Sequence, residues 1–364
     1  MNKNKPPVIG VESIANPHCH LREDGAIVAS LVEKAIEGGV DALGPMPNTS
    51  AGLLTADQVS VYISRAGESI VPGEDRMSFI PICMITEGTT VKNILDCMAI
   101  GIDDFKIYPR FRTTKSENGV MHYAPVISVV REASKIAMER FGRPMKIHLH
   151  PEHPCETYGN REAELVFTVI LRMFLEETEK SGALIISEHG TDAECIPHWR
   201  DMAVSGRFSI TLTAHHLAAN EDKTLGDVRS VCKPPIKREV DRQALVKLVG
   251  EDLGWVVAGA DDAPHDKGKK HVHEGTCACG AYTSPFLLPL YAHALDNLLA
   301  TPKGVETFVN FTSRNARKLH GLQPASRKIE LIREPFKIPY SYNIGSWVVE
   351  PFWAGQEIKW SFAP

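Results

Sequence analysis

The feature that most constrains this chain is an alternation of short β-branched runs with longer helical stretches along most of its length. Eight such runs are candidate strands, near Val8–Ala15, Asp41–Pro47, Met77–Ile85, Asp104–Tyr108, Met145–His150, Ala183–His189, Phe208–His215 and Trp255–Ala260. Helical patterns lie between them, for example over Ala124–Phe141, Arg161–Lys180 and Val240–Glu251. This alternation is typical of βα units around a parallel sheet. Eight units within roughly 250–300 residues predict an α/β fold of the (β/α)8 TIM-barrel type.

A doubly wound sheet is the competing architecture, but it usually has fewer strands and often a glycine-rich phosphate turn. Neither G-x-G-x-x-G nor G-x-x-x-x-G-K-[ST] occurs in the chain. The pattern changes after Gly321, where Lys328–Arg333 and Ile358–Phe362 read as short strands separated by prolines. We therefore expect a barrel over residues 1–321 and a small β-rich C-terminal extension over 322–364 that packs on it.

Composition narrows the functional classes. The 364 residues carry 40 basic and 45 acidic side chains, a net charge of −5, which gives no electrostatic support for nucleic-acid binding. No apolar run reaches the ~18 residues that span a bilayer, so no membrane partner is expected. The eight cysteines are scattered, and we read them as reduced thiols of a cytoplasmic protein that acts on a small molecule.

Polar groups suited to metal binding or catalysis follow several predicted strands. In a TIM barrel the carboxyl ends of the strands carry the active site. His18 and His20 follow the first strand, and alternation along extended chain puts both imidazoles on one face, with Cys19 on the other. Such a pair can share one divalent ion, although most such pairs in proteins are incidental.

Lys106 lies inside the apolar strand Phe105–Tyr108, where a charged amine is costly unless it is paired or neutralised. The simpler interpretation is a salt bridge to Asp103 or Asp104, or an amine that reaches the barrel mouth. The alternative is a lysine carboxylated by CO2, whose carbamate oxygens bridge two metals.

The later strands end in similar groups. These are His148 and His150 on the fifth strand, Glu188 and His189 on the sixth, His215 and His216 on the seventh, and Asp261, Asp262 and His265 after the eighth. A single histidine at a strand end is more often structural than a ligand. Together with Lys106, the groups of strands one, five, six and eight supply six ligands, enough for two metals with open positions for water and substrate.

These segments resemble the amidohydrolase superfamily, and within it the short, bacterial-type dihydroorotases. The matching motifs span most of the chain: His18-Cys19-His20-Leu21-Arg22, Pro45-Met46-Pro47-Asn48, Lys106-Ile107-Tyr108-Pro109 with Thr113-Thr114, Ile147-His148, Glu188-His189, His216-Leu217, Asp261-Asp262-Ala263-Pro264-His265, Trp353-Ala354-Gly355-Gln356-Glu357 and Trp360-Ser361. The combination of H-x-H-L-R, M-P-N and D-x-A-P-H is specific, whereas each motif alone is weak.

The resemblance implies a metal-dependent hydrolase that interconverts L-dihydroorotate and N-carbamoyl-L-aspartate through a metal-bridging hydroxide. Two divalent ions, expected to be zinc, would be held by His18, His20, Lys106 as a carbamate, His148, His189 and Asp261. Asp261 would also transfer the proton to the leaving nitrogen. The substrate carboxylate would be bound by Arg22, Asn48 and His265, and a mobile loop would carry Thr113 and Thr114. The family also implies a homodimer.

Each substrate-binding assignment has a simpler alternative. Arg22 could pair with its neighbours Glu23 or Asp24, and Asn48 could cap the turn at Thr49. Thr113 and Thr114 could belong to an ordinary polar loop. On the fifth strand, His150 points to the same face as His148, so the ligand could be either one, with Glu152 as a possible partner.

Some positions depart from the family pattern. Asp262 stands where serine is usual, and Arg110-Phe111-Arg112 is bulkier and more basic than expected before Thr113. These departures motivate an alternative substrate, another carboxylate-bearing cyclic ureide, imide or lactone. A catalytically inactive scaffold is a further alternative, but inactive relatives usually lose metal ligands.

Histidines and cysteines outside these motifs have weaker interpretations. Cys277 and Cys279 are too close for the usual zinc knuckle, so we expect backbone groups of their loop to face the substrate instead. The remaining histidines, interpreted as surface or structural, are His122, His198, His293 and His320.

Overall fold

A computed structural model describes residues 6–68, 70, 77–156 and 162–364 of the chain. Its largest sheet has six parallel strands in the order β10-β9-β8-β7-β6-β5. Their bounds are β5 Ile82–Ile85, β6 Asp104–Ile107, β7 Lys146–Leu149, β8 Leu184–Ser187, β9 Phe208–Leu212 and β10 Val256–Ala258. Five of the eight predicted strand regions coincide with β6 to β10, which confirms the α/β class with a parallel sheet.

A second parallel sheet continues the series with β2 (Ile14–Cys19), β3 (Val40–Pro45) and β4 (Ser78–Phe79), in that order. β4 is followed directly by β5, so the predicted strand over Met77–Ile85 is broken into two. At the other edge, an isolated parallel bridge joins Cys19 to Asp262. The amide of Asp261 donates to the carbonyl of His18 at 3.0 Å, and that of His20 to the carbonyl of Asp262 at 2.8 Å. The end of β2 therefore lies beside the segment that follows β10.

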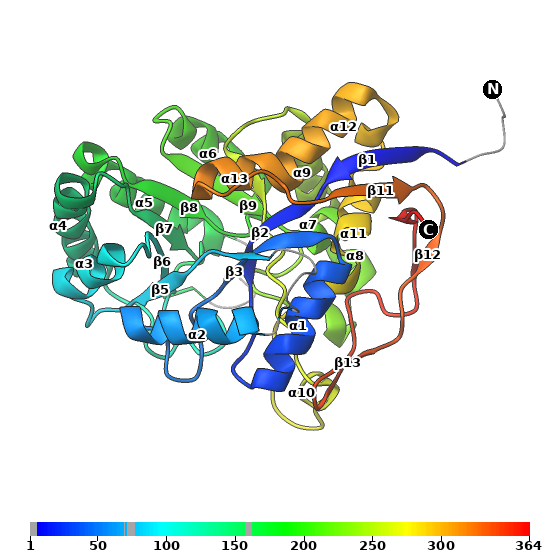
Figure 1. Ribbon diagram of the computed structural model, residues 1–364, viewed down its shortest axis with the longest axis horizontal. Coiled ribbons are helices and arrows are strands. Elements are labelled where there is room, and N and C mark those ends of the chain that lie inside the picture. Colours follow the sequence, from blue (N-terminus) through cyan, green and yellow to red (C-terminus); the bar gives the residue numbers. More distant parts are fainter. Residues whose placement is uncertain (1–5, 69, 71–76, 157–161) are drawn as a thin grey trace.

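Helices alternate with these strands (Figure 1). Their bounds are α1 Gly25–Glu37, α2 Ala56–Glu68, α3 Val91–Ala99, α4 Tyr123–Phe141, α5 Ala163–Glu177, α6 Ile196–Ala203, α7 Ala214–Ala218, α8 Glu221–Thr224, α9 Glu239–Gly250, α10 Lys267–Lys270, α11 Leu287–Ala294, α12 Pro302–Val309 and α13 Asn315–His320. The three predicted helices correspond to α4, α5 and α9, although Arg161, the predicted start of the second, lies outside the described residues.

The first predicted strand, Val8–Ala15, is wrong as a single element. The structure divides it into β1 (Val8–Glu12) and β2, and β1 pairs antiparallel with β11 (Lys328–Ile332) of the C-terminal segment. β11 in turn pairs with β16 (Ser361–Phe362). Figure 1 shows β1 and β11 side by side, so the C-terminal strands share a sheet with the start of the chain.

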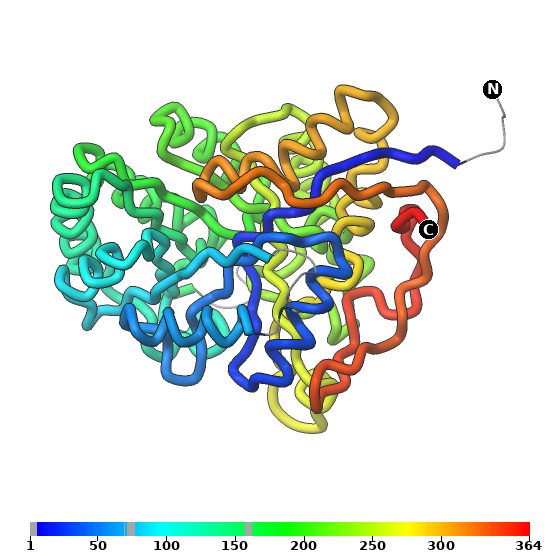
Figure 2. The backbone as a smooth tube through the Cα atoms, in the orientation of Figure 1, coloured from blue at the N-terminus to red at the C-terminus, as the bar shows by residue number. Residues whose placement is uncertain are grey.

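The rest of the C-terminal segment packs along one side of the molecule (Figure 2). It holds two small antiparallel pairs, β12 (Phe336–Lys337) with β15 (Glu357–Ile358), and β13 (Tyr342–Ile344) with β14 (Trp347–Val349). The β13–β14 turn reaches α1, where the amide of Gly345 donates to the Ser30 hydroxyl at 3.1 Å. The segment is thus β-rich and packed on the α/β body, whereas the domain boundary at residue 321 stays a prediction.

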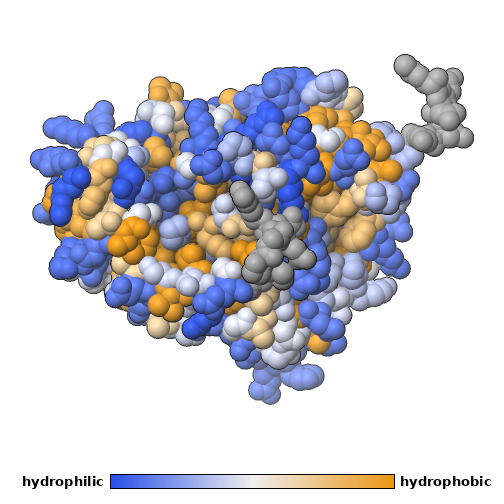
Figure 3. All heavy atoms as spheres, in the orientation of Figure 1, coloured by the Kyte–Doolittle hydropathy of each residue, from blue (hydrophilic) through white to orange (hydrophobic). Residues whose placement is uncertain are grey.

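The surface and the core differ as expected for a globular α/β protein. Figure 3 shows hydrophilic side chains over most of the periphery of one face, with hydrophobic ones in dispersed groups. Within the parts of the chain that the structure describes, no helix is both long and apolar enough to span a membrane. Inside, apolar side chains such as Phe105, Ile107 and Ile147 are fully buried around the strands, which also bury Lys106.

Candidate metal centre and active site

The first group of candidate ligands lies where β2 meets the segment after β10. Oδ1 of Asp261 lies 3.1 Å from Nε2 of His18 and 3.2 Å from Nε2 of His20. All three side chains are buried or nearly so, and their donor atoms lie within 4.8 Å of one another. Cys19 points away, with its thiol 3.7 Å from the carbonyl of Gly44. The structure thus brings together three of the predicted ligands in an arrangement that could hold one divalent ion.

Lys106 is fully buried on β6, and its Nζ has no hydrogen-bond partner among the residues that the structure describes. The nearest carboxylate oxygen, Oε1 of Glu188, is 3.8 Å away. Burial lowers the pKa of Lys106 to about 8, although the charges of Glu188 and Asp261 act in the opposite direction. A buried amine that makes no hydrogen bond is costly in free energy. A group that adds hydrogen-bonding or ligand atoms at Nζ would remove this cost.

Glu188 connects the groups of the interior, a role that the sequence analysis missed. Its carboxylate lies 2.9 Å from Nδ1 of His18 and 2.5 Å from Nδ1 of His148, and it accepts a 2.6 Å bond from the Thr211 hydroxyl. Burial alone would raise the pKa of Glu188, but the charges of Lys106 and His18 hold it well below its usual range. Its contact with Nδ1 of His18 orients that ring so that Nε2 faces Asp261.

His189, directly after β8, is buried next to His18 and His150. The ring centroids of His189 and His18 are 5.2 Å apart, and those of His189 and His150 are 4.6 Å apart. Nδ1 of His189 has no hydrogen-bond partner in the described part of the chain. Burial, followed by the charge of His150, places the pKa of His189 well below its usual range, so the ring is neutral and able to ligate a metal.

His148 does not join this group, contrary to the expected ligand set. Its Nε2 is 2.9 Å from Oδ1 of Asp104, its Nδ1 contacts Glu188, and its ring stacks on His320 at 5.4 Å. His148 pairs in register with Lys106 across β6 and β7, whereas His150 lies two residues further towards the carboxyl end. His148 therefore lies one layer deeper in the strands than His150, and the geometry favours His150 as the partner of His189.

Four of the substrate-binding candidates, Arg22, Asn48, Thr113 and Thr114, line one small cavity, and His265 contacts Arg22 beside it. Nε of Arg22 donates to the carbonyl of Pro264 at 2.8 Å, and its Nη2 lies 3.3 Å from Nε2 of His265. Nδ2 of Asn48 donates to the carbonyl of Thr114 at 2.9 Å, which fixes the Thr113–Thr114 loop over the cavity. The lining residues are His20, Arg22, Asn48, Thr113, Thr114, Lys233, Asp261, Ala263, Cys279 and Gly280.

Lys233 and Cys279 also line the cavity. Lys233 was not predicted, because it lies in a loop with no periodic pattern and belongs to no sequence motif. The loop of Cys279 was predicted to contribute backbone groups, and its carbonyl lies 2.9 Å from Nε2 of His265. Burial and the charge of Arg22 lower the pKa of His265 to about 2, so its imidazole is neutral.

Asp262 points away from the cavity. Its carboxylate accepts hydrogen bonds from the amide of Thr283 at 2.6 Å and from the hydroxyls of Thr283 and Ser284 at 2.7 and 2.8 Å. It therefore anchors the chain after the Cys279 loop, and the structure gives no support to the idea that it alters the site as a second carboxylate.

Arg112, by contrast, is buried beside the centre. Its Nη2 donates to Oε1 of Glu152 at 2.7 Å, and Oε2 of Glu152 lies 2.6 Å from Nε2 of His150. Arg112 thus links the loop of Thr113 and Thr114 to a histidine of the interior. Arg110 is half-exposed and contacts Glu87 at 3.5 Å.

Replacing Arg112 with methionine is expected to raise KM for substrate by about tenfold and to lower the melting temperature. The substitution leaves Glu152 buried without its cation, a situation that costs roughly 3–5 kcal/mol. Steady-state kinetics and thermal unfolding would measure both effects. The matched control is Arg110→Met in the same loop, expected to change stability by less than about 1 kcal/mol. Equal effects of the two substitutions would contradict the assigned role of Arg112.

In the described part of the chain, the Cys277–Cys279 region shows no group of candidate metal ligands. Cys277 and Cys279 are free thiols of intermediate exposure, and His271 contacts Glu350 at 2.6 Å. Neither cysteine belongs to a group of candidate metal ligands found among the described residues. His320, expected at the surface or in a structural role, is buried against Asp104, with which its Nδ1 makes a 2.8 Å contact.

Comparison with known proteins identifies relatives that are similar in sequence over most of the chain, although no protein-family model matches it. It is 30% identical over 349 residues to the dihydroorotase of Leptothrix cholodnii, with 94% of this chain and 95% of that protein covered. The dihydroorotase of Cupriavidus pinatubonensis is also 30% identical, over 350 residues and the same shares of the two chains.

Solved structures of a dihydroorotase and of a hydantoinase are also similar to this chain. Dihydroorotase from Saccharomyces cerevisiae, crystallised with 5-fluoroorotic acid, superposes with a TM-score of 0.84 at 25% identity and covers 98% of both chains. The L-hydantoinase (dihydropyrimidinase) of Arthrobacter aurescens has a TM-score of 0.74 at 15% identity, with 97% of this chain and 83% of that one covered. This second likeness concerns the fold alone.

Proposed function

The chain belongs to the dihydroorotase family of the amidohydrolase superfamily, and from this premise we propose how its residues carry out the reaction. The protein is a hydrolase of cyclic amide bonds that interconverts L-dihydroorotate and N-carbamoyl-L-aspartate. The observation that supports the proposal most strongly is the convergence of buried histidines, Asp261 and Lys106 beside a cavity lined by Arg22 and Asn48. The Nζ of Lys106 makes no hydrogen bond to any described residue.

We propose two divalent metal ions held by these donors. His18, His20 and Asp261 would hold one ion, and His150 and His189 the other, with Lys106 between them. Imidazole and carboxylate donors suit zinc, the metal we propose, and the neutral state of His189 fits ligation. When bound, the ions would supply Lewis-acid activation of water and of the amide carbonyl.

Lys106 is proposed to carry a carbamate. Its neutral amine nitrogen would form a bond to the carbon of CO2 and lose one proton, which gives an N-carboxylate with a single negative charge. The pKa of about 8 leaves a larger neutral fraction than an ordinary lysine has. The carbamate oxygens would replace the missing hydrogen-bond partners of Nζ, which explains how the interior tolerates this side chain.

Asp261 is the proposed proton carrier. Its Oδ1 lies at the junction of His18 and His20, and the residue also lines the cavity. Burial would raise its pKa, but the charge and hydrogen bond of His18 hold that pKa well below its usual range, so the carboxylate is ionised and can accept a proton. It would take the proton of the attacking water and return it to the amide nitrogen as the ring opens.

The substrate carboxylate is proposed to bind between Arg22, Asn48 and His265. The guanidinium of Arg22 offers a fixed fork that matches a carboxylate, and it is held in place by the carbonyl of Pro264. Asn48 already contacts the Thr114 carbonyl, so closure of the Thr113–Thr114 loop and substrate binding would use the same side chain. Closure would exclude water from the reacting amide.

Other finer features remain proposals. The two parallel sheets and the Cys19–Asp262 bridge support a closed (β/α)8 barrel. Eight free cysteines fit a reducing cytoplasm. A homodimer is proposed from the family alone.

The test is an assay of the purified, zinc-loaded protein on L-dihydroorotate and N-carbamoyl-L-aspartate, with other carboxylate-bearing cyclic ureides, imides and lactones as competing candidate substrates, the competitors. We expect turnover in both directions and weaker or no activity on the competitors. Absence of dihydroorotate turnover together with turnover of a competitor would favour the alternative substrate. Less than one equivalent of metal after growth with added zinc would favour a scaffold.

A further inference from the structure

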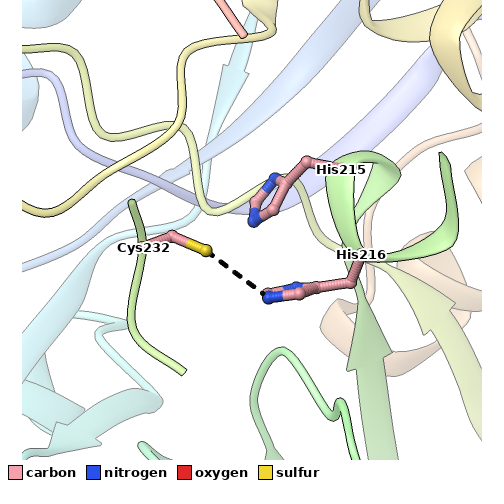
Figure 4. A group of neighbouring side chains, drawn as sticks. All are labelled: His215, His216 and Cys232. Carbon is pink, nitrogen blue, oxygen red and sulfur yellow. Dashed lines mark hydrogen bonds between the residues drawn. The ribbon is translucent and has the colours of Figure 1, made fainter. Parts of the chain in front are cut away.

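A second cluster of metal-binding side chains lies outside the centre described above. His215 and His216 stand on α7, directly after β9, and Cys232 lies on the loop that precedes α9. Figure 4 shows that the Cys232 sulfur points towards the two imidazole rings. All three side chains are at most 3% exposed, and their donor atoms lie within 4.8 Å of one another.

His215 is the most unusual member. Neither Nδ1 nor Nε2 has a hydrogen-bond partner within the described ranges, although the side chain is fully buried. Its ring lies 4.3 Å from that of His216 and 6.0 Å from that of Phe352. A buried imidazole normally satisfies at least one nitrogen, so the lack of a partner at either nitrogen, one of which is grouped with the donor atoms of Cys232 and His216, points to a ligand at this place.

Among the other donors, the sulfur-to-nitrogen distance falls within the range expected around a tetrahedral ion, and the two distances to the Pro234 carbonyl are slightly shorter. Cys232 Sγ lies 3.6 Å from Nε2 of His216 and 3.2 Å from the carbonyl of Pro234, which itself lies 3.1 Å from Nε2 of His216. Bonds of ~2.0–2.3 Å to zinc imply edges of about 3.3–3.8 Å between ligands. A nitrogen of His215 lies within 4.8 Å of the donor atoms of His216 and Cys232.

We propose that His215, His216 and Cys232 form a third zinc site, structural in role, with the Pro234 carbonyl as the fourth ligand. Nδ1 of His216, 2.8 Å from the Thr213 hydroxyl, is fixed by an outer contact of the kind that orients ligating histidines. Burial lowers the pKa of His216 to about 4, so the ring is neutral, as a ligand must be. The ion would join the end of β9 to the loop of Lys233, which lines the substrate cavity.

The thiolate gives this site a signature of its own, because the donors proposed for the catalytic centre contain no sulfur. The full-length protein is prepared with cobalt in place of zinc, and its near-ultraviolet spectrum is recorded. We expect a thiolate-to-cobalt charge-transfer band in the wild-type protein and in Cys277→Ser, a matched substitution of a free thiol outside the cluster. The band is expected to be absent in Cys232→Ser, and zinc content to fall by one equivalent in Cys232→Ser and in His215→Gln.

Absence of the band from the wild-type protein would overturn the proposal, whether or not the variants fold. Retention of the band in Cys232→Ser would also overturn it. In either case the cluster is a packed group in which Nε2 of His216 donates to the Pro234 carbonyl. The charge-transfer band does not depend on turnover. The third zinc site can therefore be disproved while the proposed catalytic centre stands, and the catalytic centre can be disproved while the third site stands.

Discussion

Replacing Lys106 with alanine is expected to lower kcat/KM for dihydroorotate by at least about 1,000-fold, which corresponds to ~4 kcal/mol of lost transition-state stabilisation. The physical reason is that the fully buried amine is the only proposed source of the group between the two metals. The substitution also creates a cavity at Nζ. Steady-state kinetics on zinc-loaded protein would measure the loss, and short carboxylic acids such as acetate or propionate are expected to restore part of the activity.

The matched control is Lys146→Ala. Lys146 is also largely buried, lies on the neighbouring strand β7, and pairs with Asp104 at 3.2 Å, away from the catalytic donors. This substitution is expected to destabilise the protein by about 3–5 kcal/mol because it removes the lysine paired with the buried Asp104 carboxylate and leaves that group with its contacts to His148 and His320. Carboxylic acids should not rescue its activity. Full activity of Lys106→Ala, or equal rescue of both variants, would contradict the carbamate.

The second large effect is expected at His150. His150→Ala should lose one metal equivalent and about 1,000-fold in kcat/KM, because the second ion would then keep one of its two proposed histidine ligands, His189. His148→Gln is the matched variant on the same strand. His148 contacts Asp104 and Glu188, so its replacement should lower stability while both catalytic metals remain bound.

Metal analysis and kinetics on the two variants discriminate between the two histidines directly. If His148→Gln loses a metal and His150→Ala keeps both, the ligand is His148, as the family resemblance implied, and not His150. Thermal unfolding of both variants checks that a loss of metal does not simply follow from unfolding.

This pair also shows how far sequence reasoning could go. Alternation along a strand places His148 and His150 on the same face, as predicted. It cannot say which layer of the interior each occupies, because that depends on the register of β7 against β6, where His148 faces Lys106. Asp104 and His320, which engage His148, are distant in sequence and gave no signal.

Asp262 shows that sequence also fails to predict the direction of a side chain next to a sharp turn. Two consecutive aspartates after a strand suggested two carboxylates in one site. The backbone at Asp261 has a φ of +47°, and the two side chains diverge, Asp261 to the histidines and Asp262 to Thr283 and Ser284. Local sequence does not reveal such a turn. The D-x-A-P-H motif nevertheless picked out Asp261, which lines the cavity, and His265, which contacts Arg22.

Strands and helices could be predicted where the pattern of apolar residues within the element itself indicates its type. Strand and helix patterns located β6 to β10 and α4, α5 and α9, because each has its own periodicity. The pairing of β1 with β11 joins residues more than 300 positions apart, and no local pattern distinguishes β1 from the start of a longer first strand. The prediction therefore missed that the C-terminal segment is anchored by the first residues of the chain.

The most direct test of the central claim is a crystal structure of the zinc-loaded protein with an anomalous difference map recorded at the zinc edge. In the catalytic centre we predict two peaks, one among His18, His20 and Asp261 and one at His150 and His189, with continuous density from Lys106 Nζ to a carboxylate between them; a peak at His215, His216 and Cys232 would belong to the separately proposed third site. Peaks at His148, or an unmodified Lys106 with neither ion beside it, would contradict the proposed catalytic centre.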